Sequence, residues 1–550
     1  MEEQNLNEYH VRLQKLKLLR EAGVVPYADR FERSHTATEA LGVAEKGEGV
    51  PGEKTKEVTD IVASLNVEGG QLKSDKLIKL CGRIMTFRDH GKLAFANLQD
   101  FSGKVQICFM KEFVGDEHYK FLRKIDVADF IGVEGELFKT RHGEVTLLVH
   151  NTTLLSKALR PLPEKWHGVT DQETIYRQRY LDTTMNRGSF DRFLFRSNLT
   201  RALREFYWSE GFVELETPVL ENVSSGAASK PFKTHHNALD MDVYLRIAGG
   251  ELWQKMALVG GFEKTFEVAR CFRNEGMDPS HLQEFTMIEH YCAFWDYEDN
   301  MKFTERMFEH VLKKLLGTTV VKIKDREGND VEVDFKAPWP RVPFTKIIEN
   351  DCGIDVLKYS EASEADGGAG GLLAEIKAKG LKIDDAENLG YGNLVDALYK
   401  KVSRPKLIQP TFVTNHPLAT KPLARKSDKD PRLCDTFQLL VNTWEVINAY
   451  SEIVDPTDQR ARFENQALAK AGGDEEAMMM NEEYLLAMEH GMPCASGWGM
   501  GVDRLVTLLT GQENLKDAVL FPLLRPLEEH SKKEKKLMEK AKEKIKKAKK

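Results

Sequence analysis

The stretch from about residue 76 to residue 158 constrains the fold of this chain most, because it consists of short runs in which apolar and polar residues alternate. The runs in "KLIKLCGRIMTFRDHGKLAFANLQDFSGKVQICFM" break at "DHG" and "DFSG", and "DFIGVEGELFKTRHGEVTLLVHNTTLLS" repeats the pattern. Alternation with a period of two predicts half-buried strands, and the Gly- and Asp-containing breaks predict turns. About five strands are expected, with one helical insert near 115–125.

Five short strands in this length are typical of a small closed barrel of the oligonucleotide-binding (OB) type. The whole chain of 550 residues is too long for one hydrophobic core, so two or three domains are expected. We predict an N-terminal helical extension at 1–75, the OB-fold domain at 76–158, a linker at 159–175, a mixed helix-and-strand domain at 176–528 with a small helical insertion at about 350–405, and a Lys-rich tail at 529–550.

The two ends of the chain carry basic amphipathic patterns. Residues 8–22 place leucines and valine among Lys and Arg, which predicts a helix that either docks on the next domain or contacts RNA. The last twenty residues hold eleven lysines and three glutamates, with a thin apolar stripe at helical spacing. This tail is either a solvated helix or a non-specific handle for phosphates.

Composition limits the class of protein. With a net charge of −7, the molecule as a whole does not attract polyanions. Any nucleic-acid contact must therefore come from local basic patches. Seven scattered cysteines without a C-x-x-C pair favour reduced thiols and argue against a structural zinc site. The N-terminus lacks a signal-peptide core, and no run approaches the ~20 apolar residues of a membrane span, so we expect a cytoplasmic protein.

A dense set of charges follows a predicted strand in the second half of the chain. The alternating run "GGFEKTFEVA" leads into "RCFRNEGMDPSHLQEF", residues 270–285, which predicts a hairpin that meets a charged ligand. Arg273 can hold a phosphate or carboxylate through two parallel N–H groups. Together with Glu275, His281 and Phe285 it suggests a nucleotide clamp, and the alternative is a surface salt-bridge network.

A glycine-rich stretch near the end favours the nucleotide clamp. In "ASGWGMGVDRLVTLL", glycines at 497, 499 and 501 precede Asp503 and Arg504 and an apolar helix. The G-x-G-x-G spacing is not a dinucleotide fingerprint, and no βαβ unit follows it. The glycines allow the backbone to approach something flat, and Arg504 can lie over an aromatic base. A third element, the helix "SNLTRALREFYWSEGF", leads into "VELETPVL", a predicted strand stopped by Pro218.

These three elements, in this order, resemble the three motifs of class II aminoacyl-tRNA synthetases, and the preceding barrel resembles the subgroup that handles lysine, aspartate and asparagine. "RPLPEKWHGVTDQETIYRQRYLD", "KPFKTHHNALDMDVYLRIA" and "EHGMPCASGWGMGVDR" resemble the lysyl-tRNA synthetase family, and the resemblance covers roughly residues 8–528. It implies an α+β multidomain fold, with an N-terminal OB-fold anticodon-binding barrel followed by a catalytic domain built on an antiparallel β-sheet flanked by helices.

The resemblance implies ATP-dependent ligation of L-lysine to tRNA(Lys) through a lysyl-adenylate, with release of AMP and diphosphate, by a homodimer formed through the "VELETPVL" region. Two alternatives stay open. A synthetase-like RNA-binding regulator would lack Arg273, Glu275 or Arg504, and all three are present. A paralogue that lysylates another acceptor would lack the barrel.

The resemblance also implies the roles of the ATP-site residues. Arg273 holds the α-phosphate, Glu275 the adenine amino group and His281 the γ-phosphate, while Phe285 and Arg504 enclose the base. Glu445 completes the ATP-binding set of six. Arg273 and Arg504 are the catalytic residues, acting by charge and position, since the lysine carboxylate is already a nucleophile.

The cofactor implied by the resemblance is Mg²⁺, which bridges the polyphosphate. Its ligands would be Glu445 and Gln438, and Gln438 departs from the acidic residue usual at that position. A neutral amide binds Mg²⁺ less strongly, so the number of metal ions stays open. Leu282 and Gln283 replace a usual Asn-Pro pair, and "RIAGGEL" differs from a usual proline-containing segment.

A lysine pocket must neutralise two ammonium groups, which requires buried carboxylates. By resemblance, Glu452 and Tyr291 hold the ε-ammonium, and Glu251 holds the α-ammonium beside Gly226. The full lysine-binding set is Gly226, Glu251, Glu289, Tyr291, Asn448, Tyr450 and Glu452.

In the barrel, Phe95, Gln106 and Glu144 match positions that read the anticodon in this family. An aromatic ring stacks on an unpaired base, and polar side chains read its edge. The alternative for Phe95 is a place in the barrel core.

Overall fold

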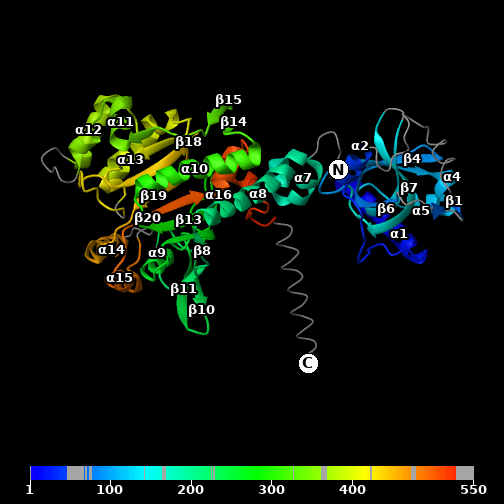
Figure 1. Ribbon diagram of the computed structural model, residues 1–550, viewed down its shortest axis with the longest axis horizontal. Coiled ribbons are helices and arrows are strands. Elements are labelled where there is room, and N and C mark those ends of the chain that lie inside the picture. Colours follow the sequence, from blue (N-terminus) through cyan, green and yellow to red (C-terminus); the bar gives the residue numbers. More distant parts are fainter. Residues whose placement is uncertain are drawn as a thin grey trace. The chain divides into compact units, whose positions relative to one another are not determined.

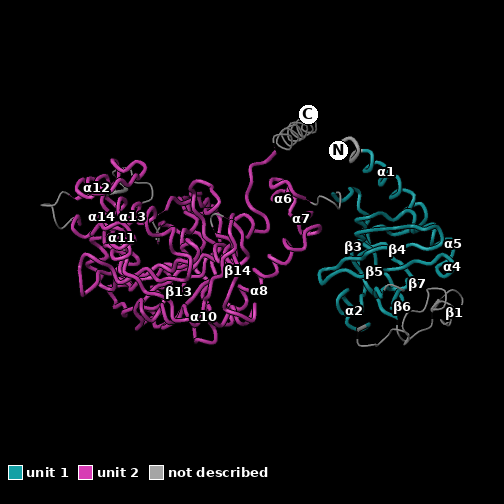
Figure 2. The backbone as a smooth tube through the Cα atoms, turned by 90° about the horizontal axis from the view of Figure 1, so that it is seen from above, with its two compact units in different colours: residues 1–168 teal, residues 169–550 magenta. Residues whose placement is uncertain are grey.

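The computed structural model describes residues 2–45, 67–68, 71–72, 77–140, 143–163, 169–224, 226, 229–325, 328–360, 368–421, 424–471 and 478–527. The chain forms two compact units, Met1–Gly168 and Val169–Lys550 (Figure 2). The Lys-rich tail predicted at 529–550 lies outside the described residues.

Unit 1 contains a closed five-stranded barrel with the strand order β3-β4-β5-β7-β6. All its strand pairs are antiparallel except β5–β7. The five predicted strands and the helical insert are therefore confirmed. The elements of unit 1 are α1 (Glu2–Glu21), α2 (Ala37–Glu45), β1 (Val67–Glu68), β2 (Gln71–Leu72), β3 (Ile78–Asp89), β4 (Leu93–Gln99), β5 (Lys104–Met110), α4 (Lys111–Val114), α5 (Asp116–Leu122), β6 (Phe130–Lys139) and β7 (Val145–Ser156).

Unit 2 is built on an eight-stranded sheet with the order β16-β17-β18-β19-β20-β13-β12-β8 (Figure 1). The pairs β16–β17 and β12–β8 at the two edges are parallel, and the pairs between them are antiparallel. The sheet strands are β8 (Val213–Glu214), β12 (Lys264–Phe272), β13 (Glu284–Ala293), β16 (Arg341–Pro343), β17 (Thr411–Thr414), β18 (Thr436–Val441), β19 (Trp444–Ser451) and β20 (Ala495–Gly501).

Helices and smaller strands surround this sheet. The helices are α6 (Gln172–Arg177), α7 (Arg179–Met185), α8 (Arg187–Ser209), α9 (Glu251–Val259), α10 (Tyr297–Leu316), α11 (Phe344–Cys352), α12 (Gly368–Ala378), α13 (Tyr391–Val402), α14 (Pro456–Ala471), α15 (Glu482–Glu489) and α16 (Val502–Leu509). The smaller strands are β9 (Leu220–Glu221), β10 (Lys233–His236), β11 (Met241–Leu245), β14 (Val320–Lys324) and β15 (Asp330–Asp334). None of the helices among the described residues is long and apolar enough to span a bilayer.

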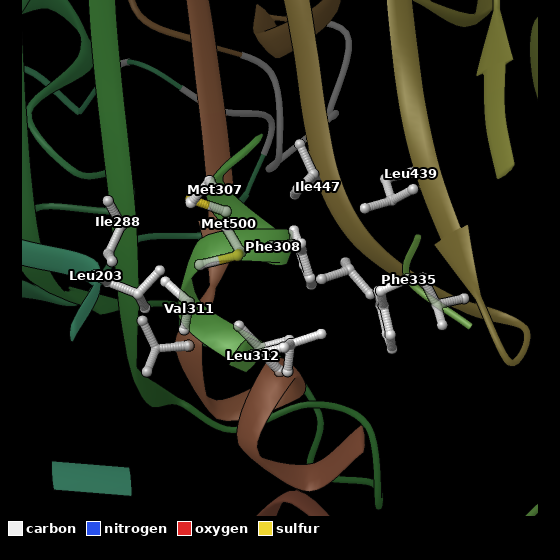
Figure 3. Close-up of a cluster of buried hydrophobic side chains, with 14 of the residues drawn as sticks. Leu203, Ile288, Met307, Phe308, Val311, Leu312, Phe335, Leu439, Ile447 and Met500 are labelled. Carbon is white, nitrogen blue, oxygen red and sulfur yellow. The ribbon is translucent and has the colours of Figure 1, made fainter. Parts of the chain in front are cut away.

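One face of the central sheet is apolar and packs against α8, α10 and α16. Successive side chains of a strand point to opposite faces, so Ile288, Ile447 and Met500 all face α10 (Figure 3). There they meet Phe308 and Leu312, within a core that is almost fully buried. Burial of each such side chain contributes about 1.5–3 kcal/mol. On the opposite face, β13, β20 and β19 carry polar residues and glycines, while Val413 of β17 and Leu440 of β18 belong to a second apolar cluster.

The predicted strand in "VELETPVL" is too long, since β8 ends at Glu214. The chain leaves the sheet because Thr217 pairs with a side chain instead of a neighbouring backbone. Its N–H and its hydroxyl both donate to Glu267 Oε2, at 3.2 and 2.6 Å. A side chain that captures the backbone in this way competes with the strand ladder.

The stretch from 344 to 402 contains three helices, α11, α12 and α13, and buries apolar residues of its own. Ile348, Leu372, Leu394 and Leu398 are fully buried in one cluster, which is distinct from the cluster behind the central sheet. The same cluster includes Val413 of β17 and Leu440 of β18, so this helical region packs on the central sheet through a second core.

Candidate active site

The predicted site residues converge on the free face of three neighbouring strands, β13, β20 and β19. In the middle strand β20, Gly499 pairs with Glu289 of β13 and with Asn448 of β19. Two residues further along, Gly497 pairs with Tyr291 and with Tyr450. Because residues two apart share a face, the glycines form a strip without side chains between two polar rows.

Position 497 of this strip must be glycine, because neighbouring side chains of the protein fill the space that a side chain there would need. A Cβ atom there would lie 2.1 Å from Glu452 Oε1 and 2.5 Å from Tyr291 Cε1. A Cβ atom at Gly499 would lie 3.5 Å from Glu289, which is ordinary contact. Gly499 and Gly501 line a cavity, as the sequence predicts for residues that let a ligand approach. Gly497 instead makes room for Glu452 and Tyr291.

A β-bulge sets the functional residues of β19 on one side. Ile447 pairs with Leu439 of β18, and Glu445 pairs with Leu440, so Val446 has no partner. The extra residue shifts the alternation. Glu445 therefore shares a face with Asn448 and, further on, with Tyr450. One strand thus carries residues of both predicted subsites, for ATP and for lysine.

A cavity of about 230 Å³ brings the predicted ATP residues together. The hairpin β12–β13 supplies one wall, and β19 and the start of α16 supply the other. Asn448, Leu282 and Asp503 also line it. All six residues that the sequence assigns to ATP line this single cavity: Arg273, Glu275, His281, Phe285, Glu445 and Arg504.

Several of these side chains are held in place by neighbours. The Arg273 guanidinium lies 5.1 Å from the centre of the Phe285 ring, and its Nε donates to Ile247 O at 3.2 Å. Glu275 accepts a hydrogen bond from Ser229 Oγ. Arg504 Nη1 donates to the backbone oxygen of Glu445 at 3.1 Å. Residues fixed in this way are preorganised for binding.

Beside this cavity, three carboxylates gather from three elements: Glu251 at the start of α9, Glu289 on β13 and Glu452 after β19. Tyr450 OH donates to Glu251 Oε1 at 3.2 Å, and Tyr291 OH lies 3.4 Å from Glu289 Oε2. A Cβ atom on Gly226 would lie 3.2 Å from the Glu251 Cβ. The predicted lysine-site residues are therefore neighbours.

The electrostatics of this group favour a cation. Burial, together with the nearby Glu251, raises the pKa of Glu289 to about 7. Burial likewise raises the pKa of Glu452 to about 7, against the opposing effect of a neighbouring lysine. Oxygen Oε1 of Glu452 is buried without a hydrogen-bond partner. A buried acceptor left unpaired costs free energy, which a bound ammonium would recover.

Comparison with known proteins agrees with this geometry. The family model for class II tRNA synthetases (D, K and N) matches residues 171–525, and the model for the OB-fold nucleic acid binding domain matches residues 78–155. The chain belongs to the class II tRNA synthetases of the D, K and N group.

Curated relatives of this synthetase cover nearly the whole chain. The protein of Carboxydothermus hydrogenoformans is 44% identical over 527 residues, which are 96% of this chain and 100% of the relative. The protein of Lactococcus lactis subsp. lactis is 42% identical over 94% of this chain and 98% of the relative. That of Thermosipho africanus is 40% identical over 94% and 95%. Each of the three carries the name lysine–tRNA ligase.

The two predicted metal ligands of the synthetase differ in position. Glu445 lines the nucleotide cavity. Burial alone would raise the pKa of its carboxyl, but the positive charges of Lys421 and Arg504 outweigh burial. The pKa of Glu445 therefore lies below its ordinary value, and its carboxyl is ionised at neutral pH. Gln438 is buried with its Oε1 3.3 Å from His416 Nε2, and it is not among the cavity-lining residues. No group of three or more His, Cys, Asp or Glu side chains in the described ranges is arranged to hold a metal.

This arrangement fits a Mg²⁺ ion that arrives with its nucleotide. Mg²⁺ is usually held by one or two carboxylates together with substrate phosphates. Glu445 supplies one ionised carboxylate on the cavity wall. The role of Gln438 stays a prediction.

Sequence reasoning missed two lysines of the synthetase site. Lys255 Nζ lies 2.6 Å from Glu251 Oε1 and 2.6 Å from Glu452 Oε2. Lys421 Nζ donates to Asn448 Oδ1 at 3.3 Å. The spacing of Glu251 and Lys255, four residues apart on one helix, is the signal that could have found Lys255.

The departure at "RIAGGEL" has a structural reason in this synthetase. The Gly249 N–H donates to Glu289 Oε1 at 2.7 Å, and a proline has no N–H to give. Gly250 has φ +76°, and a Cβ atom there would lie 2.2 Å from Thr217 Oγ1. Only glycine fits both the conformation and the space at that position.

Two of the predicted anticodon residues lie on neighbouring strands of the synthetase barrel, Phe95 on β4 and Gln106 on β5, and Glu144 immediately precedes β7. Gln106 Nε2 donates to Glu144 Oε2 at 2.7 Å. Phe95 pairs across the strands with Cys108, is half-buried, and packs in a small cluster with Phe138 and Leu148. This cluster is separate from the barrel interior, so Phe95 is not part of the barrel core.

Proposed function

We propose that this chain is a lysine–tRNA ligase, which activates L-lysine with ATP and transfers it to tRNA(Lys), releasing AMP and diphosphate. One observation carries the proposal. Three carboxylates with an unpaired buried oxygen lie on the same sheet face as the cavity that contains all six predicted ATP residues. A site of that charge beside a nucleotide cavity suits an amino acid with a second ammonium group.

Lysine is recognised by charge at both ends. Glu452, through its free Oε1, and Tyr291 bind the ε-ammonium. Glu251 beside Gly226 binds the α-ammonium, and Tyr450 lines the aliphatic stem. Asn448 and Arg273 bind the α-carboxylate. Glu289 supports the floor of the pocket, because the Gly249 N–H fixes its carboxylate.

ATP is held with its base between Phe285 and Arg504, and Glu275 accepts from the adenine amino group. The lysine carboxylate attacks the α-phosphorus, the bond between the α-phosphorus and the α,β-bridging oxygen breaks, and diphosphate leaves with that oxygen. Arg273 neutralises the charge that develops on the α-phosphate, and His281 contacts the γ-phosphate. When bound, Mg²⁺ neutralises the polyphosphate. Glu445 would hold it, with Gln438 as a second ligand.

In the second step the terminal ribose of tRNA attacks the lysyl-adenylate and AMP leaves. The barrel selects the tRNA: Phe95 stacks on an anticodon base, while Gln106 and Glu144 read base edges. The bond between Gln106 and Glu144 fixes both side chains before the RNA arrives.

The synthetase acts as a homodimer through the face formed by α8 and the "VELETPVL" segment. Apolar side chains are exposed there: Trp208, Val213, Val219 and Leu220 are between 41% and 53% exposed. Trp208 lines one hollow with Leu520 and Phe521, which are exposed as well. Exposed apolar groups in such numbers are typical of an interface with a second protein surface.

The two alternatives fit less well. A regulator without catalysis would have lost part of the ATP site, whereas Arg273, Glu275 and Arg504 all line the cavity. A paralogue with another acceptor would lack the barrel, which is present.

A charging assay with labelled lysine tests the proposal. The purified chain, ATP and Mg²⁺ are incubated with tRNA(Lys) and, in parallel, with tRNA(Asp) and tRNA(Asn). We expect acid-precipitable lysine on tRNA(Lys) only, with AMP formed in equal amount. Lysine on tRNA(Asp) or tRNA(Asn), or no lysine on tRNA(Lys), would refute the proposal.

A further inference from the structure

Lys255 lies within the group of predicted lysine-site carboxylates, and no predicted role accounts for it. It is 4% exposed and projects from α9 into the group of carboxylates. Its Nζ contacts Glu251 Oε1 and Glu452 Oε2, each at 2.6 Å. It also lies 5.4 Å from the centre of the Tyr291 ring and 5.8 Å from that of Tyr450. A buried lysine with two carboxylate partners joins α9 to β19.

The contact of Lys255 with Glu452 is one-sided. The lysine takes Oε2, while Oε1 lies over Gly497 with no partner. A carboxylate held at one oxygen cannot rotate without losing its ion pair. Lys255 therefore fixes the orientation of the Glu452 carboxylate, with one oxygen at the lysine and the other over Gly497.

We propose that Lys255 is a positioning residue for lysine recognition, which holds Glu452 by one oxygen so that the other faces the ε-ammonium of the substrate. The inference rests on the function proposed above and deepens it. Lys255 contacts neither the reacting carboxylate nor the phosphates in this arrangement. It acts on binding through Glu452.

Charge supports the same role. Three carboxylates close together repel each other, and burial disfavours their ionised forms. Lys255 lowers the pKa of Glu452 against burial and against Glu251 and Glu289. Titratable groups face this cluster from each of the surrounding elements. They are Glu251 and Lys255 of α9, Glu289 and Tyr291 of β13, Tyr450 of β19, Tyr484 of α15, Glu221 of β9 and Arg273 after β12.

The opposite role is that Lys255 occupies the ammonium position until the substrate displaces it. The two roles predict opposite signs. Removal of a positioning lysine weakens lysine binding, whereas removal of a competing lysine strengthens it.

The test compares Lys255→Met, which keeps the length without the charge, with Lys255→Arg, which keeps the charge. The control is Lys264→Met, because Lys264 also contacts aromatic rings of unit 2 but lies outside the site. Lysine-dependent pyrophosphate exchange is measured from pH 6 to 8.5 for KM of lysine, KM of ATP and kcat. Inhibition by norleucine, which lacks the ε-ammonium, is measured in parallel, and a melting curve accompanies each variant.

For Lys255→Met we expect KM of lysine to rise at least tenfold at pH 7, with KM of ATP and inhibition by norleucine changed less than twofold. The loss should shrink toward pH 8.5, where Glu452 ionises without help. Lys255→Arg should keep most of the affinity, and Lys264→Met should match the unaltered chain.

An unchanged or lower KM of lysine in Lys255→Met would overturn the positioning role, as would an equal rise in both KM values. Absence of lysine-dependent exchange in the unaltered chain would instead refute the proposed function itself. The two failures are therefore distinguishable.

Discussion

At the scale of single residues, the site is built from charges whose partners are only partly supplied by the protein. Glu452 has one paired and one unpaired oxygen, and Glu445 is ionised on the wall of the nucleotide cavity. Arg273 gives one N–H to Ile247 O and keeps the rest of its guanidinium for a ligand. Unpaired groups of this kind lower the stability of the free protein, and a ligand that pairs with them binds more tightly.

Replacing Arg273 with alanine should abolish lysine-dependent pyrophosphate exchange. An unneutralised α-phosphate loses a dominant electrostatic contribution, about 3 kcal/mol or more, which corresponds to roughly 10²–10³-fold in kcat. The rate is measured at saturating ATP, with a melting curve to confirm folding. Near-normal exchange by a folded variant would remove Arg273 from the chemistry.

The affinity for lysine should depend on pH near neutrality. The pKa values of Glu289 and Glu452 are raised to about 7 in the free site, so both become protonated as the pH falls through 7. A cationic substrate needs them ionised, so KM of lysine should rise as the pH falls from 8 to 6. Titration of KM across this range checks the sign, and a KM that falls toward pH 6 would contradict it.

At the scale of elements, the strip of glycines on β20 connects the two subsites. Its neighbours β13 and β19 carry the polar rows, while the other face of the same strands closes the core with α10 (Figure 3). A single strand can serve both faces because its side chains alternate.

Substituting Gly497 with alanine should disturb the amino-acid subsite before the nucleotide subsite. The added Cβ would collide with Glu452 Oε1 and the Tyr291 ring, so one of them must move. Overpacking of this kind costs about 1–3 kcal/mol of stability. We expect KM of lysine to rise well above any change in KM of ATP, and Gly370→Ala, at an open position on α12, serves as the control.

Much of this arrangement could be predicted from the sequence. The barrel strands follow from their alternation, and the β12–β13 hairpin from a strand that runs into a polar turn. The strand in "VELETPVL" was predicted too long, because the capture of Thr217 by Glu267 depends on a residue fifty positions away. Lys255 was missed because its pairing with Glu452 exists only once α9 packs on β12 and β13 and the chain after β19 reaches it. Local patterns carry no information on such contacts.

At the scale of the whole molecule, the two units carry different parts of the proposed reaction. Unit 2 contains the nucleotide cavity and the carboxylates, and unit 1 contains the barrel with the residues expected to read the anticodon. A separate RNA-reading unit lets selection of the tRNA differ from selection of the amino acid.

The proposed dimer can be tested on the exposed apolar face. Leu220→Asp places a charge where Leu220 is 50% exposed, and an unpaired charge buried in an interface is strongly unfavourable. Light scattering should show a dimer for the unaltered chain and monomers for the variant. Leu468→Asp, at a 71% exposed position on α14, should stay dimeric. Identical masses for all three proteins would place the interface elsewhere.

The central claim is that Glu452 binds the ε-ammonium of lysine beside a nucleotide cavity on the same sheet. The most direct measurement is pyrophosphate exchange by Glu452→Gln, with KM determined separately for lysine and for ATP. Loss of the charge partner of a buried ammonium costs roughly 2–5 kcal/mol. We predict that KM of lysine rises at least thirtyfold while KM of ATP changes less than threefold. Equal changes in the two KM values, or an unchanged KM of lysine, would contradict the account.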